Sequence, residues 1–365
     1  MSTQPVAGFL YSPRAMDQLV ANSSAERLDR ASKQAPPRKA QTIRRILVCV
    51  DNSSSSEACV QCAADLSRHL GSTITLLHVI EAPREGSAAH DAGAIDWEIS
   101  REQASTRLGA LGRQTTEVSG SVVDTRLEQG HPAERITTLA GELDVDLTVL
   151  GSQGERRSPA WSLGSTALQI LAATRRSVLI TPPTCSAGRG VPLKRVLVPL
   201  DGSSRSESVL PTAVQIAQAN DAELLLVFVV REPLPTLVLH APSDIALARD
   251  LAARVESNGQ IYLEELGKHL AREGARVRTL VLRSTDEKQS LLDLGRAEPS
   301  DLIVLSAHGS TCNPALAFGS VTTHLLTHAA VPLLVLQDLY DSELRAGDHD
   351  QRAPPLRASF PPDEV

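Results

Sequence analysis

The chain has 365 residues, of which 42% are hydrophobic and 2% aromatic, and its formal net charge at pH 7 is −7. This length predicts two domains. The acidic balance and the scarcity of aromatic residues argue against a basic groove or a stacking surface for nucleic acid. No apolar stretch approaches the roughly 18 residues that a membrane span needs, and residues 1–43 lack the apolar region of a secretory signal. We therefore expect a cytoplasmic protein whose partners include neither nucleic acid nor membrane.

Short apolar runs alternate with helical patterns from residue 44 onward. Residues 1–43 combine proline with scattered charge, which predicts a disordered or loosely docked tail. Periodicity then predicts strands at 45–50, 73–79, 121–127, 146–150 and 177–181. It predicts helices at 55–69, 94–113, 131–142 and 164–173.

The second half of the chain follows the same order after a linker at 182–193, which is marked by proline and glycine. A long middle helix is predicted near 243–272, and residues 338–365 form a second proline-rich tail. Strands are predicted at 195–200, 223–230, 276–283, 301–305 and 332–336.

The two halves are copies of one pattern. RRILVCVDNSSSSEACVQCAADLSRHLGSTITLLHVI, which starts at Arg44, is similar to KRVLVPLDGSSRSESVLPTAVQIAQANDAELLLVFVV, which starts at Lys194. Runs such as ILVCV and LLLVFVV are apolar on both faces, as in parallel strands covered by helices on each side. The repeat predicts an α/β protein made of two tandem, open, five-stranded parallel sheet domains with helices on both faces, at 44–181 and 194–337.

A glycine-containing loop follows the fourth strand of the first copy: GSQGERRSPAWSLGS, which starts at Gly151. Gly151, Gly154 and Gly164 either permit a positive φ or let a ligand approach bare backbone. The carboxyl end of a parallel strand is where open α/β folds bind ligands. Gly164, Ser165 and Thr166 also open the next helix, whose free N–H donors can hold phosphate oxygens. The pattern therefore predicts a phosphate-binding loop.

An aspartate ends the first strand of each copy, at Asp51 and Asp201, and a serine cluster follows each of them. The alternative role of such an aspartate is turn formation. The sheet edge that these residues share with the glycine loop favours a ligand contact.

These motifs resemble the universal stress protein family across both copies. They are a first strand that ends in Asp, the second strand LLHVI, and a loop of the form G, two residues, G, nine residues, G, Ser. The tandem arrangement resembles the two-domain members of that family. The resemblance implies a Rossmann-like fold of the adenine nucleotide alpha hydrolase type, and an ATP-binding stress-response regulatory module that holds ATP with or without Mg²⁺.

The resemblance also implies roles for single positions. In nucleotide-binding members, two matching positions flank the adenine, here Asp51 and Val79. Other matching positions meet the ribose and phosphates, here Gly151, Gly154, Gly164 and Ser165. The second copy matches at Asp201, Val229, Gly309, Gly319 and Ser320. It departs at Ser306, which replaces the first glycine and puts the second site in doubt.

The sequence favours binding over catalysis. It lacks the GxxxxGK[ST] loop whose lysine reaches the β and γ phosphates, and no general base is evident. Two alternatives stay open. One is a slow ATPase in which Asp51 or Ser165 positions Mg²⁺ or water, and the other is a nucleotide-free interaction protein of the same fold.

Cysteine and histidine pairs have less chemical significance here. Cys59 and Cys62 form a CxxC inside a helical pattern, where we predict core residues with reduced thiols. His324 and His328 have the i, i+4 spacing of metal ligands but no acidic partner, which predicts an ordinary helix face or subunit contact. His308 flanks the second glycine loop, where solvent exposure and a phosphate contact are the two alternatives.

The fifth strands, SVLI and PLLVL, are candidate pairing surfaces. In the resembled family such strands join two domains across a dyad. We therefore expect the two copies to form an intramolecular pseudo-dimer, and two chains to associate as a homodimer.

Overall fold

The computed structural model describes residues 43–53, 55–81, 90–153, 163–182, 193–232, 242–313 and 316–338. The expected tails and most of the expected linker lie outside these ranges. Two residues assigned to tails from sequence are part of the folded core: Ile43 is buried at the start of the described chain, and Asp338 is buried at its end. Among the described residues, no helix combines the length and the apolar character needed to cross a bilayer.

The two halves of the chain form the same succession of elements. The first consists of β1 (Arg45–Val50), α3 (Ser55–Leu70), β2 (Thr73–Ile80), α4 (His90–Ser119), β3 (Val123–Gln129), α5 (Pro132–Glu142), β4 (Leu147–Gly151), α6 (Ser165–Ala173) and β5 (Ser177–Thr181). The second consists of β6 (Arg195–Leu200), α7 (Ser204–Glu207), α8 (Leu210–Ala219), β7 (Glu223–Arg231), α9 (Pro242–Arg272), β8 (Arg276–Ser284), α10 (Glu287–Ala297), β9 (Leu302–Ser306), α11 (Ser320–His328) and β10 (Leu333–Leu336).

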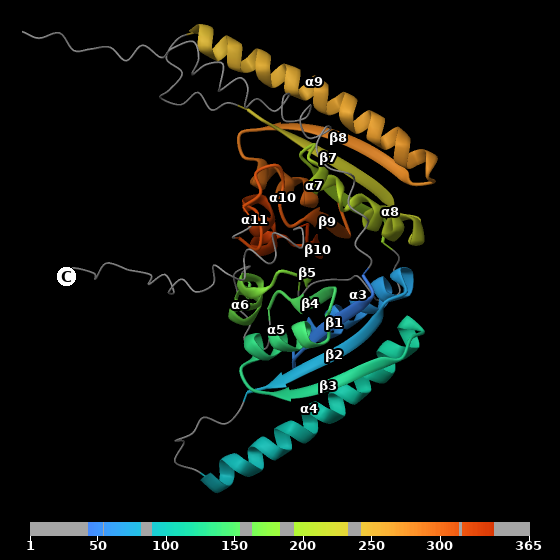
Figure 1. Ribbon diagram of the computed structural model, residues 1–365, viewed down its shortest axis with the longest axis vertical. Helices are drawn as coiled ribbons and strands as arrows, with labels where there is room; N and C mark the ends of the chain where they lie inside the picture. Colours follow the sequence, from blue (N-terminus) through green and yellow to red (C-terminus); the bar gives the residue numbers. More distant parts are fainter. Residues whose placement is uncertain are drawn as a thin grey trace, which may run out of the picture.

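All ten strands belong to one sheet, in the order β3-β2-β1-β4-β5-β10-β9-β6-β7-β8. Each half is parallel, as predicted, and the halves join where β5 pairs antiparallel with β10. Figure 1 shows this junction at the middle of the molecule, with α4 and α9 at its two ends. The predicted pseudo-dimer is confirmed. Association of two chains stays a prediction, and the paired fifth strands are not available for it.

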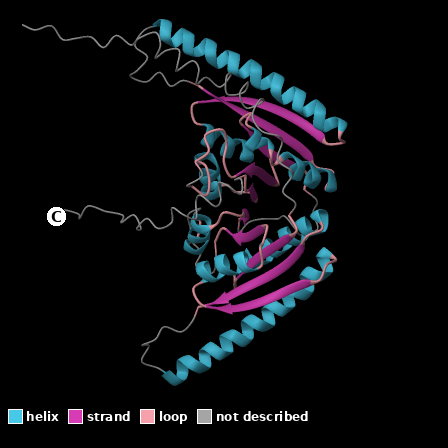
Figure 2. Ribbon diagram, viewed as in Figure 1, coloured by secondary structure: helices cyan, strands magenta, loops and turns pink. Residues whose placement is uncertain are grey.

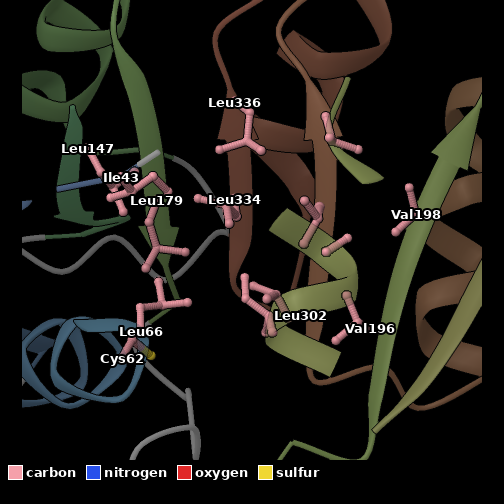
Figure 3. Close-up of a cluster of buried hydrophobic side chains, with 14 of the residues drawn as sticks. Ile43, Cys62, Leu66, Leu147, Leu179, Val196, Val198, Leu302, Leu334 and Leu336 are labelled. Atoms are coloured by element: carbon pink, nitrogen blue, oxygen red, sulfur yellow. The ribbon is translucent and has the colours of Figure 1, made fainter. Parts of the chain in front are cut away.

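Helices cover both faces of the sheet (Figure 2). Side chains of α3, α4, α8 and α9 pack on one face, and those of α5, α6, α10 and α11 pack on the other. Each face has a buried cluster that contains residues from both halves. Figure 3 shows part of the first cluster, where Leu179 of β5 and Leu334 of β10 lie on either side of the junction. The two copies therefore share a continuous core.

Helix α4 is longer than predicted: it covers His90–Ser119, whereas the prediction was 94–113. Its buried positions Ala104, Leu108, Leu111 and Thr115 keep helical spacing, but most of the other described side chains are exposed. The period is therefore visible in only part of the helix. Strand β3 starts two residues later than predicted, because this edge strand is largely polar.

Cys59 and Cys62 are buried in the first cluster as thiols outside any disulfide, in agreement with the predicted core positions. The Sγ atom of Cys59 lies 2.8 Å from Thr181 Oγ1. His324 and His328 stack with ring centroids 4.4 Å apart on α11. In the described part of the chain, no group of three or more candidate ligands surrounds them.

Candidate nucleotide site

Strand order reverses between β1 and β4, because β1 is followed in the chain by β2 on one side while β4 flanks it on the other. Parallel sheets open a crevice at such a point, beyond the carboxyl ends of the strands. A cavity of about 350 Å³ lies there. It brings together six of the predicted residues of the first copy: Asp51, Val79, Gly151, Gly164, Ser165 and Thr166. Gly154 lies outside the described residues.

The backbone at the described loop glycines excludes one of the two roles considered from sequence, the positive-φ turn. Gly164 has φ −63° and ψ 155°, which any residue adopts, and Gly151 is not in the positive-φ region either. A Cβ atom at Gly151 would lie 3.3 Å from the Gln153 carbonyl oxygen and 3.5 Å from Cys59 Sγ. Close approach of backbone, and not a left-handed turn, is therefore what Gly151 provides.

The N-terminus of α6 faces this cavity. Its N-cap residue is Gly164, which has no side chain to satisfy the first-turn amides. Ser165 and Thr166 are exposed and line the cavity. The hydroxyl of Ser152 adds a second polar group: the side chain is 7% exposed, lines the same cavity and has no hydrogen-bond partner within the described structure. A buried hydroxyl without a partner and the first-turn amides of a helix can both donate hydrogen bonds to an acceptor-rich anion.

Asp51 uses one carboxylate oxygen to shape the loop after β1. Its Oδ1 accepts hydrogen bonds from the Ser53 amide at 2.9 Å and the Ser56 hydroxyl at 2.8 Å. Among the described residues, no hydrogen bond is formed to Oδ2, although Asp51 lines the cavity. Arg107 of α4 holds the same loop by donating to the carbonyls of Asn52 and Ser53. The turn and ligand roles considered from sequence are therefore compatible: Oδ1 shapes the turn, and Oδ2 is available for a ligand.

Sequence reasoning missed several residues that line the cavity. Ser152 follows a glycine in a loop, which is the signature of an ordinary turn. Cys49 lies one residue before the end of β1, and Pro132 and Ile136 come from the first turns of α5. Burial, together with the nearby Cys59, raises the pKa of the Cys49 thiol far above its usual range, so this thiol stays protonated. It contributes apolar lining instead of a nucleophile.

The second copy has the same backbone frame. Gly319 is the N-cap of α11, with φ −70° and ψ 169°, and Ser320 opens that helix. Val229 on β7 is half-buried, as is Val79 on β2. The Gly319 amide donates to the Ala307 carbonyl at 2.8 Å, just as the Gly164 amide donates to Ser152 at 2.8 Å.

The side chains of the second copy are arranged differently. Oδ2 of Asp201 accepts a hydrogen bond from the Ser310 amide at 2.7 Å. His308, for which solvent exposure was one alternative, is 2% exposed. Its Nδ1 lies 2.8 Å from Asp338 Oδ1, and its Nε2 lies 2.9 Å from the Leu316 carbonyl oxygen. The hydroxyl of Ser306 donates to the His308 carbonyl and so fixes the loop.

Hydrogen bonds and burial also set the charges near Asp201. Burial favours a higher pKa for Asp201, but hydrogen bonds from Ser203, Ser310 and Ser206 outweigh it and lower this pKa. Glu207 shows the opposite result. Burial raises its pKa, the charge of Asp201 adds to the rise, and a hydrogen bond from Tyr262 opposes it.

Glu207→Gln is expected to raise the free energy of unfolding at neutral pH. A carboxyl whose pKa is raised by folding destabilises the folded state while it is ionised, and this cost disappears as pH falls through the folded pKa. The gain in the variant should therefore shrink on acidification, because the wild-type carboxyl becomes neutral. Urea unfolding at neutral and acidic pH measures both effects.

The matched control for that experiment is Glu57→Gln, because Glu57 occupies the corresponding position of the first copy and is exposed. It should leave stability unchanged at both pH values. A Glu207→Gln protein less stable than wild type at neutral pH would contradict the prediction.

Fold and cavity together define an α/β protein with a cleft at the reversal of strand order. The model of the universal stress protein family matches residues 42–182 and 192–337. The chain therefore belongs to this family, and the resemblance seen in the motifs is confirmed.

Some relatives match both copies of the chain, and others match one copy. The chain is 24% identical over 312 residues to universal stress protein Rv2623 of Mycobacterium tuberculosis, covering 80% of this chain and 96% of that protein. It is 27% identical over 144 residues to universal stress protein MJ0531 of Methanocaldococcus jannaschii, covering 40% and 82%. The crystal structure of a universal stress protein from Archaeoglobus fulgidus superposes with a TM-score of 0.55 at 17% identity, covering 82% of this chain and 100% of that one. This last likeness bears on the fold alone.

Proposed function

We propose that the protein binds ATP in the first cleft and acts as a stress-response regulatory module. The observation that carries this proposal is the convergence of unsatisfied polar groups on one cavity of about 350 Å³. They are the first-turn amides of α6, the Ser152 hydroxyl and Oδ2 of Asp51.

These groups match the two ends of an adenine nucleotide. Amides at a helix N-terminus and a hydroxyl donate to phosphate oxygens. A carboxylate oxygen only accepts, so Asp51 is suited to the hydroxyls of a ribose or the amino group of an adenine. Val79 and Ile136 offer apolar surface at the same cavity. Mg²⁺, where it accompanies ATP, would neutralise phosphate charge, with the Ser165 hydroxyl as an oxygen donor in the lining.

The described lining favours binding without turnover. It contains no lysine, arginine or histidine, and its Cys49 thiol is held protonated by burial. Cleavage of a phosphate bond relies on positioned cations and a group that orients water. The cavity is therefore better suited to hold a nucleotide than to hydrolyse it.

Isothermal titration calorimetry of the full chain with ATP tests the proposal. Saturable binding is expected for the wild type, and Gly164→Val should abolish it, because a branched side chain would project where the phosphates meet the backbone. The dihedral angles of Gly164 suit valine, so circular dichroism should show an intact fold. Gly319→Val is the matched control in the second copy, where a Cβ meets only ordinary contacts at 3.5 and 3.6 Å. Absence of ATP binding to the wild type would refute the proposal.

A further inference from the structure

We propose that the second cleft is held closed by the chain's own side chains, so that each chain binds one nucleotide, in the first cleft. This inference rests on the proposed function. It assigns a self-closing role to Asp201 and to a bridge formed by Arg205, Asp338 and His308.

Asp201 forms an internal contact that none of the described residues forms with its counterpart Asp51. Both aspartates use Oδ1 to bind the loop after their strand, through Ser53 in the first copy and Ser203 in the second. The second oxygen differs. Oδ2 of Asp201 accepts the Ser310 amide at 2.7 Å, and a Cβ at Gly309 would lie only 2.5 Å from it. The glycine loop is therefore drawn directly onto the carboxylate, and Gly309 serves this internal contact instead of a ligand.

A buried group of three side chains, His308, Asp338 and Arg205, fixes that loop. The side chains of His308 and Asp338 are each 1% exposed, with Nδ1 and Oδ1 2.8 Å apart. Arg205 Nη1 lies 3.1 Å from the other carboxylate oxygen of Asp338. Since His308 Nε2 also lies 2.9 Å from the Leu316 carbonyl oxygen, the ring connects two points of the loop to Asp338, which follows β10 in the chain. Separating these buried groups would leave polar atoms without hydrogen-bond partners, so the loop is firmly fixed.

The first copy has none of these bridging side chains at the matching positions. Ser55 stands where Arg205 does, Gln153 where His308 does and Pro183 where Asp338 does. Conversely, the orphaned hydroxyl of Ser152 is matched by Ala307, which is fully buried. Because the backbone hydrogen bonds at the base of both loops are the same, the difference between the clefts comes from side chains.

Binding stoichiometry tests the inference. Native mass spectrometry and calorimetry of the full chain with ATP should give one nucleotide per chain. Gly164→Val, which should abolish binding in the first cleft, should lower the count to none at ATP concentrations that saturate the wild type, and Gly319→Val in the second copy should leave it at one. Two nucleotides per wild-type chain, or one remaining in Gly164→Val, would overturn the inference. No nucleotide on the wild type would instead refute the proposed function.

A loop exchange tests the closing contacts themselves. The triple variant Ser306→Gly, Ala307→Ser, His308→Gln gives the second loop the sequence GSQG of the first. Asp338 keeps its Arg205 partner in this variant, and stoichiometry should rise from one to two. A folded triple variant that still binds one nucleotide would show that the contacts of Ser306 and His308 do not close the cleft.

Discussion

Ser165→Pro is expected to weaken ATP binding by about 10- to 100-fold while leaving the fold intact. A hydrogen bond to a charged group contributes about 1.5–3 kcal/mol, and each 1.4 kcal/mol corresponds to about tenfold in affinity. The substitution removes one amide donor and one hydroxyl at the cavity. Titration calorimetry with ATP measures the loss.

Proline suits this position for structural reasons. It is tolerated in the first turn of a helix, where its missing N–H has no helical partner. Gly164, the preceding residue, is already extended at ψ 155°, as proline requires, and Ser165 is exposed. Ser320→Pro is the matched control, since Gly319 is extended at ψ 169° and α11 also has nine residues. Equal losses in the two variants, or no loss in Ser165→Pro, would contradict the assignment of phosphate to α6.

Leu334→Ala is expected to lower the free energy of unfolding by about 2–5 kcal/mol, as for other large-to-small changes in cores. Leu334 is 0% exposed on β10 and pairs with Leu179, which is 1% exposed on β5. Figure 3 shows these two side chains on either side of the junction between the halves. The truncation leaves a cavity where the core of one copy continues into the other.

Urea unfolding followed by circular dichroism measures this loss. Leu168→Ala is the control, because Leu168 is a leucine of α6 that is 47% exposed, and surface substitutions change stability by less than about 0.5 kcal/mol. A loss below about 1 kcal/mol in Leu334→Ala would show that the junction contributes little to the stability of the whole chain.

Much of the fold could be predicted from sequence because its signals are local. Strands such as β1 and β7 are apolar on both faces, and the internal repeat doubles each observation. The cluster of Asp51, Gly151 and Ser165 was predictable too, since the carboxyl ends of neighbouring parallel strands meet at one sheet edge. Pairing of β5 with β10 was expected from the family resemblance, and the structure confirms it.

What could not be predicted depends on tertiary contacts. Ser152 is a functional candidate only because packing leaves its hydroxyl buried without a partner. His308 and Asp338 are 30 residues apart, and neither carries a local signal that the two meet. Asp338 was assigned to the tail by composition, and His308 was considered solvent-exposed or phosphate-bound. Only the folded chain shows that they close a loop together.

The junction between β5 and β10 has a consequence for how the two clefts can differ. In an assembly of two identical chains, any replacement appears in both subunits, so the sites stay equivalent by symmetry. Here the two partners are covalently one polypeptide, and each position can change alone. His308 and Asp338 can thus stand beside one cleft while Gln153 and Pro183 occupy the matching positions of the other copy. Because the two copies are parts of one chain, one copy can change its cleft while the cleft of the other copy stays the same.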